Sequence, residues 1–351
     1  MLDRQSRAAA IRGHDHLRRS PRRFGGPGGF KEWHHVLVET DELSLLVNFN
    51  LTDDMWSPRP AADEVARLIV LARVADDRGW RGEAERFAPA DVAVAAGGVD
   101  ATFGASRLRF DGERYHVAAA LRSGAIAADL ALRPAVDPCV FTNQRLGSAS
   151  LLSWFLVPRL TATGAVTVDG RTLELRDAPA YHDHNWGHYL WGDDFVWEWA
   201  WACGSCPEGP WSAVFWRLAD RHRRRATSSG LLVELPGGPP LRFLDDEVRV
   251  TGHGLHRPSR ALRLPAVMAL LCPGTHCDAP ETIVLEAARG GAGVDLRFSL
   301  GDLAQIIVPN EADDDGATTL NEFSGRCRMS AAVDGRALAG EGRCVVELLR
   351  A

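Results

Sequence analysis

The residues best suited to chemistry are concentrated in one stretch, Tyr181 to Trp201, which reads YHDHNWGHYLWGDDFVWEWAW. Acids and imidazoles are costly to bury without partners, so their mixture with aromatic residues predicts a hydrogen-bonded network beside an apolar wall. From Trp197 onward, indoles alternate with small or acidic residues, which is the period-2 pattern of a strand. The stretch therefore predicts an aromatic-walled cavity with a carboxylate and imidazoles at one end.

Asp183 is the candidate catalytic acid of this stretch. A carboxylic acid in an apolar pocket tends to keep its proton, because desolvation disfavours the charged form, and it can then protonate an alkene carbon. If the motif is extended, Tyr181, Asp183 and Asn185 share one face of the strand. The opposite face then carries His182, His184 and Trp186. Only one of these two sets can face a pocket directly.

The imidazoles and indoles around Asp183 have predicted supporting roles. His182 and His184 are candidate catalytic residues, because imidazoles beside a carboxylate can orient it or shuttle its proton. Indole faces can stabilise a passing cation by ~2 kcal/mol when desolvated. The candidate substrate-binding residues are Tyr181, Asn185, Trp186, Trp197, Trp199, Trp33 and His34.

Structural explanations of the same residues remain open. Asp183 and His184 can cap a turn between two barrels, with Asn185 and Gly187 supplying the turn geometry. The indoles at 197, 199 and 201 are also typical of a core, and Glu198 between them is either exposed or paired with an arginine. Metal binding by histidines is the further alternative, with the candidate ligands His182, His184 and His188. No metal is expected there.

The cysteines give a separate alternative. Cys203 and Cys206 form a CxxC pair, and Cys272 and Cys277 form a looser one, so the four thiols could build a zinc site. The second spacing is long and contains Pro273, which favours separate loop thiols instead. An odd total of seven cysteines argues against a disulfide framework.

Composition sets broad limits on the function. The 351 residues suit one large or two ordinary domains, and 46% hydrophobic with 25% charged residues is typical of a soluble globular protein. A net charge of −6 gives no general reason to expect nucleic-acid binding. No apolar run is long enough for a membrane span. The Arg-rich and then Gly/Pro-rich segment 1–29 is predicted to be a disordered leader, and a cytoplasmic location is expected.

The rest of the chain reads as β-strands joined by short glycine turns. Alternating or aliphatic runs surround turns such as Asp111-Gly112, Ser123-Gly124, Asp169-Gly170 and Asp334-Gly335. Strands at this spacing predict an all-β fold of antiparallel sandwiches or barrels with few short helices. They are too many for one small barrel, so we expect two domains, 30–192 and 193–351.

Specific motifs add a family resemblance. The string YHDHNWG, the following WG and WEW, the early EWHH and the segment VPRLTATGAVTVDG together resemble the hydroxyneurosporene synthase (carotenoid 1,2-hydratase) and AttH-like family, from Phe30 to the end of the chain. The resemblance implies a tandem lipocalin-like architecture, an acid at Asp183, and no metal or cofactor. Because the carotenoid hydratases differ immediately after this acid, DHNWG places the chain nearer the AttH-like branch.

Three functions follow as hypotheses. The leading one is a cofactor-independent hydratase or cyclase that protonates an apolar isoprenoid or polyene-like small molecule through Asp183. The second is a natural-product cyclase of pericyclic (Diels–Alder) or conjugate-addition type, in which shape matters more than acidity. The third is a non-catalytic lipocalin-like carrier of a hydrophobic ligand. A hydrophobic small molecule is the expected partner, without nucleic acid or stable membrane insertion.

Overall fold

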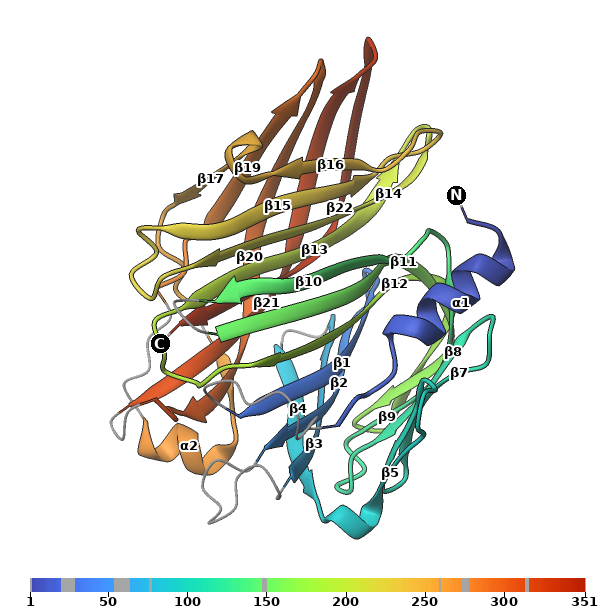
Figure 1. Cartoon of the computed structure of the whole chain (residues 1–351), viewed down its shortest axis with the longest axis vertical. Helices are drawn as coiled ribbons and strands as arrows, with labels where there is room; N and C mark the ends of the chain where they lie inside the picture. Colours follow the sequence, from blue (N-terminus) through green and yellow to red (C-terminus); the bar gives the residue numbers. More distant parts are fainter. Residues whose placement is uncertain are drawn as a thin grey trace. The chain divides into compact units, whose positions relative to one another are not determined.

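The structure, a computed structural model, describes residues 2–19, 29–53, 64–75, 78–146, 150–258, 260–272, 278–312 and 316–350. The chain divides into two compact units: the first comprises Met1–Gln144 with Ala149–Leu190, and the second Arg145–Ser148 with Trp191–Ala351. Each unit is built on one large, mainly antiparallel sheet (Figure 1). The predicted all-β fold is confirmed. The chain passes from the first unit to the second after residue 190, whereas the expected domain boundary lay after residue 192.

The first unit contains a twelve-stranded sheet in the order β4-β3-β2-β1-β12-β11-β9-β8-β7-β6-β5, with β10 paired to β11. The sheet curls, so that β3 lies against β6 and β9. A short 3₁₀ helix, η1 (Pro89–Asp91), precedes β5. The strands are β1 (Phe30–Glu39), β2 (Leu43–Asp53), β3 (Glu64–Val74), β4 (Trp80–Phe87), β5 (Val92–Val94), β6 (Asp100–Phe103), β7 (Ser106–Phe110), β8 (Tyr115–Ala120), β9 (Ile126–Pro134), β10 (Cys139–Leu146), β11 (Ser150–Val168) and β12 (Arg171–His188).

The second unit contains a ten-stranded sheet in the order β16-β15-β14-β13-β22-β21-β20-β19-β17, with β18 added parallel to β20. Its helices are η2 (Asp245–Glu247) and α2 (Ala266–Leu271). The strands are β13 (Val196–Cys206), β14 (Gly209–Ala219), β15 (Ala226–Glu234), β16 (Leu241–Leu244), β17 (Val248–His253), β18 (Ala261–Leu264), β19 (Thr282–Arg289), β20 (Ala292–Pro309), β21 (Ala317–Val333) and β22 (Arg336–Arg350).

Two of the predicted Asp-Gly turns connect pairs of long strands. Asp169-Gly170 joins β11 to β12, and Asp334-Gly335 joins β21 to β22. All four residues have positive φ, between 48° and 81°. Two-residue hairpin turns with positive φ at both positions match the right-handed twist of the strands, and Gly adopts this conformation without steric cost. The Asp169-Gly170 turn sets the pairing of β11 with the start of β12, the strand that carries Asp183.

An N-terminal helix, α1 (Arg4–His14), belongs to the first unit (Figure 1). The Asp3 side chain caps it by accepting the backbone N–H of Ser6. Ala8, Ile11 and Leu17 are buried in the core of the unit, among the inward-facing residues of the sheet. The prediction of a disordered leader over 1–29 is therefore wrong for residues 4–19. Ala8 and Ile11 of the helix, with Leu17 just after it, dock this segment onto the core of the unit. Composition alone does not reveal such tertiary docking.

No helix among the described residues is both long enough and apolar enough to cross a membrane.

Candidate active site

Strand β12 lies at the centre of the first sheet, between β1 and β11. The register places Asp183 opposite His35 of β1 and Leu156 of β11. Ala178 and Ala180 of β12 lie in the core of the unit, so from residue 178 onward the even-numbered residues face inward and the odd-numbered residues face the other side. The chemistry of this strand is therefore divided between two faces.

The odd-numbered face holds the Asp183 group, which we define as Tyr181, Asp183 and Asn185. The Tyr181 hydroxyl lies 2.8 Å from Asp183 Oδ2, and the Asn185 amide donates to Oδ1 over 2.8 Å. All three side chains are buried, and Asp183 is 3% exposed. Because a tyrosine hydroxyl can donate or accept, it can hydrogen-bond this carboxyl in either protonation state.

Apolar and aromatic residues surround the Asp183 group on the same face. Trp33 of β1 and Trp154 of β11 are registered on either side of Asn185, and Leu156 lies beside Asp183. Burial, aided by the nearby His182, lowers the pKa of His35 to about 3. His35 is therefore a neutral imidazole at pH 7, on the strand next to Asp183.

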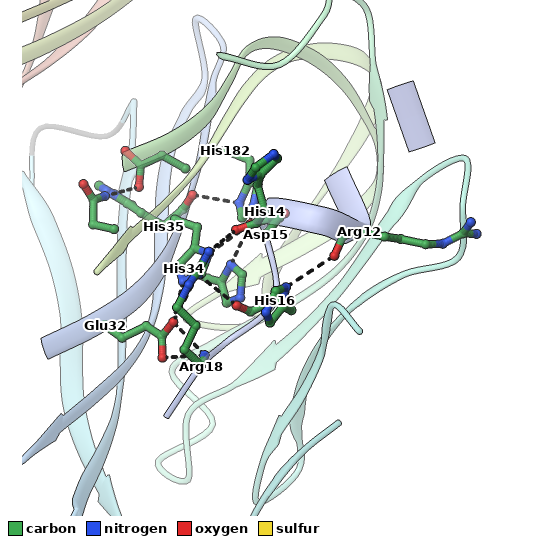
Figure 2. Close-up of polar contacts among 12 residues, drawn as sticks. Arg12, His14, Asp15, His16, Arg18, Glu32, His34, His35 and His182 are labelled. Carbon is green, nitrogen blue, oxygen red and sulfur yellow. Dashed lines mark hydrogen bonds and ion pairs between the residues drawn. The ribbon is translucent and has the colours of Figure 1, made fainter. Parts of the chain in front are cut away.

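The even-numbered face holds a second group, the histidine cluster, which we define as Asp15, His34, His182 and His184. Figure 2 shows Asp15, His34 and His182 converging at the end of α1. His182 Nε2 lies 2.9 Å from Asp15 Oδ2, His34 Nδ1 lies 3.3 Å from Oδ1, and His184 Nδ1 lies 3.6 Å from Oδ1. All four residues are fully buried.

A second carboxylate and an arginine complete one side of the histidine cluster. His184 Nε2 lies 2.9 Å from Glu32 Oε1, and Glu32 accepts the backbone N–H groups of Arg18 and Arg19. The Arg18 guanidinium lies over the Trp186 ring, 3.6 Å from its centroid. Burial raises the pKa of Glu32, although the N–H and charge of Arg18 oppose the shift.

Burial and close packing shift the pKa values of the cluster itself. Burial and the neighbouring His184 lower the pKa of His34 to about 4, and burial lowers the pKa of His184 well below its usual value. Burial opposes ionisation of Asp15, but the imidazoles of His182 and His34 outweigh it and hold its pKa below the usual range. Burial and the Asp15 charge raise the pKa of Tyr115, whose hydroxyl donates to Asp15 Oδ2 over 2.6 Å.

The structure does not place the predicted catalytic histidines beside the Asp183 carboxyl. The side chains of His182 and His184 point to the opposite face of β12, where Asp15 and Glu32 bind them. His34, a predicted substrate-binding residue, joins them there. The strand alternation explains this division, because adjacent residues of a strand cannot serve the same side of a sheet.

The predicted indoles of the second half belong to the second unit. Trp197 and Trp199 lie on the face of β13 opposite to Ala200 and Ala202, which line the core of that unit. Glu198 faces inward and is paired with arginines, which was one of the two predictions for this residue. Its Oε2 lies 3.1 Å from Arg217 Nη1, and its Oε1 lies 3.1 Å from Arg350 Nη2. Glu198, Arg217 and Arg350 line a polar cavity of about 860 Å³ in this unit.

Three other predictions concern His188, the motif 181–187 and the cysteines. His188 does not join the histidine cluster; its ring lies 5.2 Å from that of Phe30. The motif 181–187 is a continuous part of β12, so it is not a turn between barrels. Cys203 and Cys206 lie on β13 and Cys272 follows α2, while Cys277 lies outside the described residues.

Sequence reasoning missed Asp15, Glu32, Arg18 and Tyr115. The only local signal was the string GHDHLR after a helix-compatible segment, where Asp15 is flanked by two histidines. Its partners His34 and His182 lie far along the chain, and only the docking of α1 brings Asp15 to them.

No family model matches the sequence, and no curated protein sequence matches it. Solved structures match by fold. An AttH-type protein (NE1406) from Nitrosomonas europaea has a TM-score of 0.60 at 15% identity, covering 93% of this chain and 95% of that one. Kievitone hydratase from Nectria haematococca has a TM-score of 0.55 at 12% identity, covering 93% and 89%.

A third similar structure is CghA with Sch210972, with a TM-score of 0.53 at 11% identity, covering 92% of this chain and 89% of that one. The TM-scores show that the fold is shared, while identities this low leave the activity open. The chain thus has the fold of the AttH-type protein, kievitone hydratase and CghA, as the AttH-like part of the resemblance led us to expect.

Proposed function

We propose that the chain is an enzyme that hydrates or cyclises an apolar isoprenoid or polyene-like small molecule, with Asp183 as the acid. The observation that carries this proposal is the Asp183 group: a buried carboxyl fixed by Tyr181 and Asn185, on a face that also carries Trp33, Trp154 and a neutral His35. That a hydratase shares the fold supports the reaction class.

The proposed step begins with transfer of the Asp183 proton to the less substituted alkene carbon, which leaves a tertiary cation and a carboxylate. A water molecule then forms a C–O bond to the cation and releases a proton, directly or through His35, that restores the acid. The sum is addition of one water. In the cyclising variant an internal alkene forms a C–C bond to the cation, and loss of a neighbouring proton restores Asp183. The step itself needs no cofactor.

The surrounding side chains have defined roles in this step. Tyr181 and Asn185 hold the two carboxyl oxygens, so the proton is presented in one direction, and orientation of this kind accounts for much of enzymatic rate enhancement. The neighbouring indoles can stabilise the cation through their ring faces by about 2 kcal/mol each when desolvated.

Substrate identification comes first. Freshly purified protein would be analysed by native mass spectrometry and solvent extraction for a co-purifying hydrophobe. The extracted compound, or a panel of isoprenoids with a trisubstituted terminal alkene, would then be incubated with the enzyme in D₂O. Acid-initiated hydration adds one water and one carbon-bound deuterium.

The other outcomes contradict the proposal in different ways. A cyclised product of unchanged mass without deuterium indicates a pericyclic closure that does not use Asp183 as an acid. A bound hydrophobe that is recovered unchanged after long incubation indicates a carrier.

A further inference from the structure

The histidine cluster lies on the opposite face of β12 from the Asp183 group, and the proposed reaction does not use it. Asp15 comes from the end of α1, His34 from β1, and His182 and His184 from β12. Three imidazoles and a carboxylate, all fully buried, meet around one oxygen, Asp15 Oδ1. Burying these four groups without full hydrogen bonding is costly, so their presence together indicates a stabilising partner or a functional role.

The outer hydrogen bonds of two imidazoles orient their lone pairs toward Asp15. His182 Nδ1 lies 3.1 Å from the backbone carbonyl of His35, which can only accept, so this nitrogen carries the proton. His184 Nε2 likewise faces the Glu32 carboxylate at 2.9 Å. In the neutral imidazoles, His182 Nε2 and His184 Nδ1 are therefore bare lone pairs aimed at Asp15.

His34 is the most unusual member of the cluster. It is 0% exposed, and neither ring nitrogen has a hydrogen-bond partner among the described residues. Its ring lies over that of His184, with centroids 4.4 Å apart, and its Nδ1 points toward Asp15 Oδ1 without hydrogen-bond alignment. A buried nitrogen without a hydrogen bond is destabilising, so the unmade hydrogen bonds of His34 indicate a missing partner.

The spacing of three donor atoms, from Asp15, His34 and His182, fits a metal ion, and His184 lies outside this set. In a tetrahedral zinc site with bonds of about 2.0–2.1 Å, neighbouring donor atoms lie about 3.4 Å apart. From Asp15 Oδ1, the nitrogens of His182, His34 and His184 lie at 3.1, 3.3 and 3.6 Å. The donor atoms of Asp15, His34 and His182 all lie within 4.8 Å of one another. Tyr115 donates to the other oxygen and leaves Oδ1 available.

We propose that the histidine cluster binds one divalent first-row transition-metal ion through Asp15, His34 and His182, with Zn²⁺ a good fit to two imidazoles and one carboxylate. Three protein donors leave the fourth tetrahedral position open, and the ion would join the end of α1 to β1 and β12. The His35 carbonyl would be the outer partner that fixes the tautomer of His182, as in other metal sites.

The competing explanation is a proton in place of the metal. If His182 is doubly protonated, its Nε2–H donates to Asp15 and the pair is satisfied without an ion. That arrangement still leaves His184 Nδ1 and both nitrogens of His34 without a hydrogen-bond partner among the described residues. The two explanations differ in whether the protein binds a stoichiometric metal.

The test uses the full chain without a polyhistidine tag. Metal content per chain would be measured by elemental mass spectrometry after purification, after removal by a chelator, and after addition of Zn²⁺ or Co²⁺. We expect one equivalent to rebind, an X-ray absorption spectrum of the zinc form with two imidazole nitrogens among its ligands, and a higher unfolding temperature for the loaded protein. Failure to bind an equivalent of either ion would overturn the proposal, whatever the state of the variants.

Variants locate the site. His34→Gln and His182→Gln should each lose the equivalent of metal, because each variant removes one of the three donor side chains. The matched control is His188→Gln, on the same strand but outside the cluster, which should keep the metal. Asp183→Asn should also keep it, which separates this site from the proposed reaction. Retention of the metal by both His34→Gln and His182→Gln would show that it binds elsewhere.

Discussion

At the residue scale, the side chains of β12 differ in function because they alternate between two faces. Tyr181 and Asn185 bind the two oxygens of Asp183, while His182 and His184 face Asp15 and Glu32 on the other side. The sequence alone predicted this division of the motif, since it follows from strand geometry. The partners on the inward face were not predictable, because they depend on a helix more than 150 residues away in sequence.

Removal of the Tyr181 hydroxyl tests the orientation of Asp183. Tyr181→Phe keeps the buried ring but deletes the hydrogen bond between the Tyr181 hydroxyl and the Asp183 carboxyl. A hydrogen bond to a charged group contributes about 1.5–3 kcal/mol, so we expect kcat to fall by about 10- to 100-fold with a smaller change in KM. Steady-state kinetics on the identified substrate would measure this. An unchanged kcat would mean that Tyr181 is only a packing residue.

The second unit offers a test of burial through its cysteines. Burial raises the pKa of the Cys327 thiol, which is 1% exposed in the core, and the thiolate is the reactive form. We expect iodoacetamide at neutral pH to modify the half-buried Cys206 while Cys327 stays unmodified until denaturant is added. Peptide mass spectrometry would score both sites. Rapid modification of Cys327 in the native protein would contradict its placement on the inner face of β21.

At the element scale, the sequence predicted the strands better than the helix. Hairpins such as those at Asp169-Gly170 and Asp334-Gly335 have local signals, because turn chemistry and strand alternation are read over a few residues. Helix α1 has a weaker signal: its segment is rich in arginine and contains few apolar residues. Its stability comes from docking on the sheet, which is a tertiary effect that no short window contains.

A core substitution in α1 tests that docking. Ile11 is fully buried in the core of the first unit, so Ile11→Ala should lower the free energy of unfolding by about 2–5 kcal/mol. Gln5→Ala, on the exposed side of the same helix, is the control and should change it by less than about 0.5 kcal/mol. Urea unfolding followed by circular dichroism would compare them. Equal stabilities would show that α1 does not pack on the sheet.

At the scale of the whole molecule, each unit has its own sheet and its own buried polar chemistry. The first contains the Asp183 group and the histidine cluster, and the second a cavity in which Glu198 bridges Arg217 and Arg350. The number and spacing of strands were sufficient to predict two β units. The contents of their interiors were not, because inward-facing charged residues look the same in sequence as exposed ones on an alternating strand.

The central claim is that Asp183 donates the proton that starts the reaction. The most direct measurement compares wild type, Asp183→Asn and Asp129→Asn on the identified substrate in D₂O, scoring turnover and carbon-bound deuterium. Asp129 is an exposed aspartate of the same unit and serves as the matched control. We predict that Asp183→Asn loses at least about 100-fold in rate, together with the deuterium label, while Asp129→Asn keeps both. An Asp183→Asn enzyme that turns over and incorporates deuterium at the wild-type rate would contradict the claim.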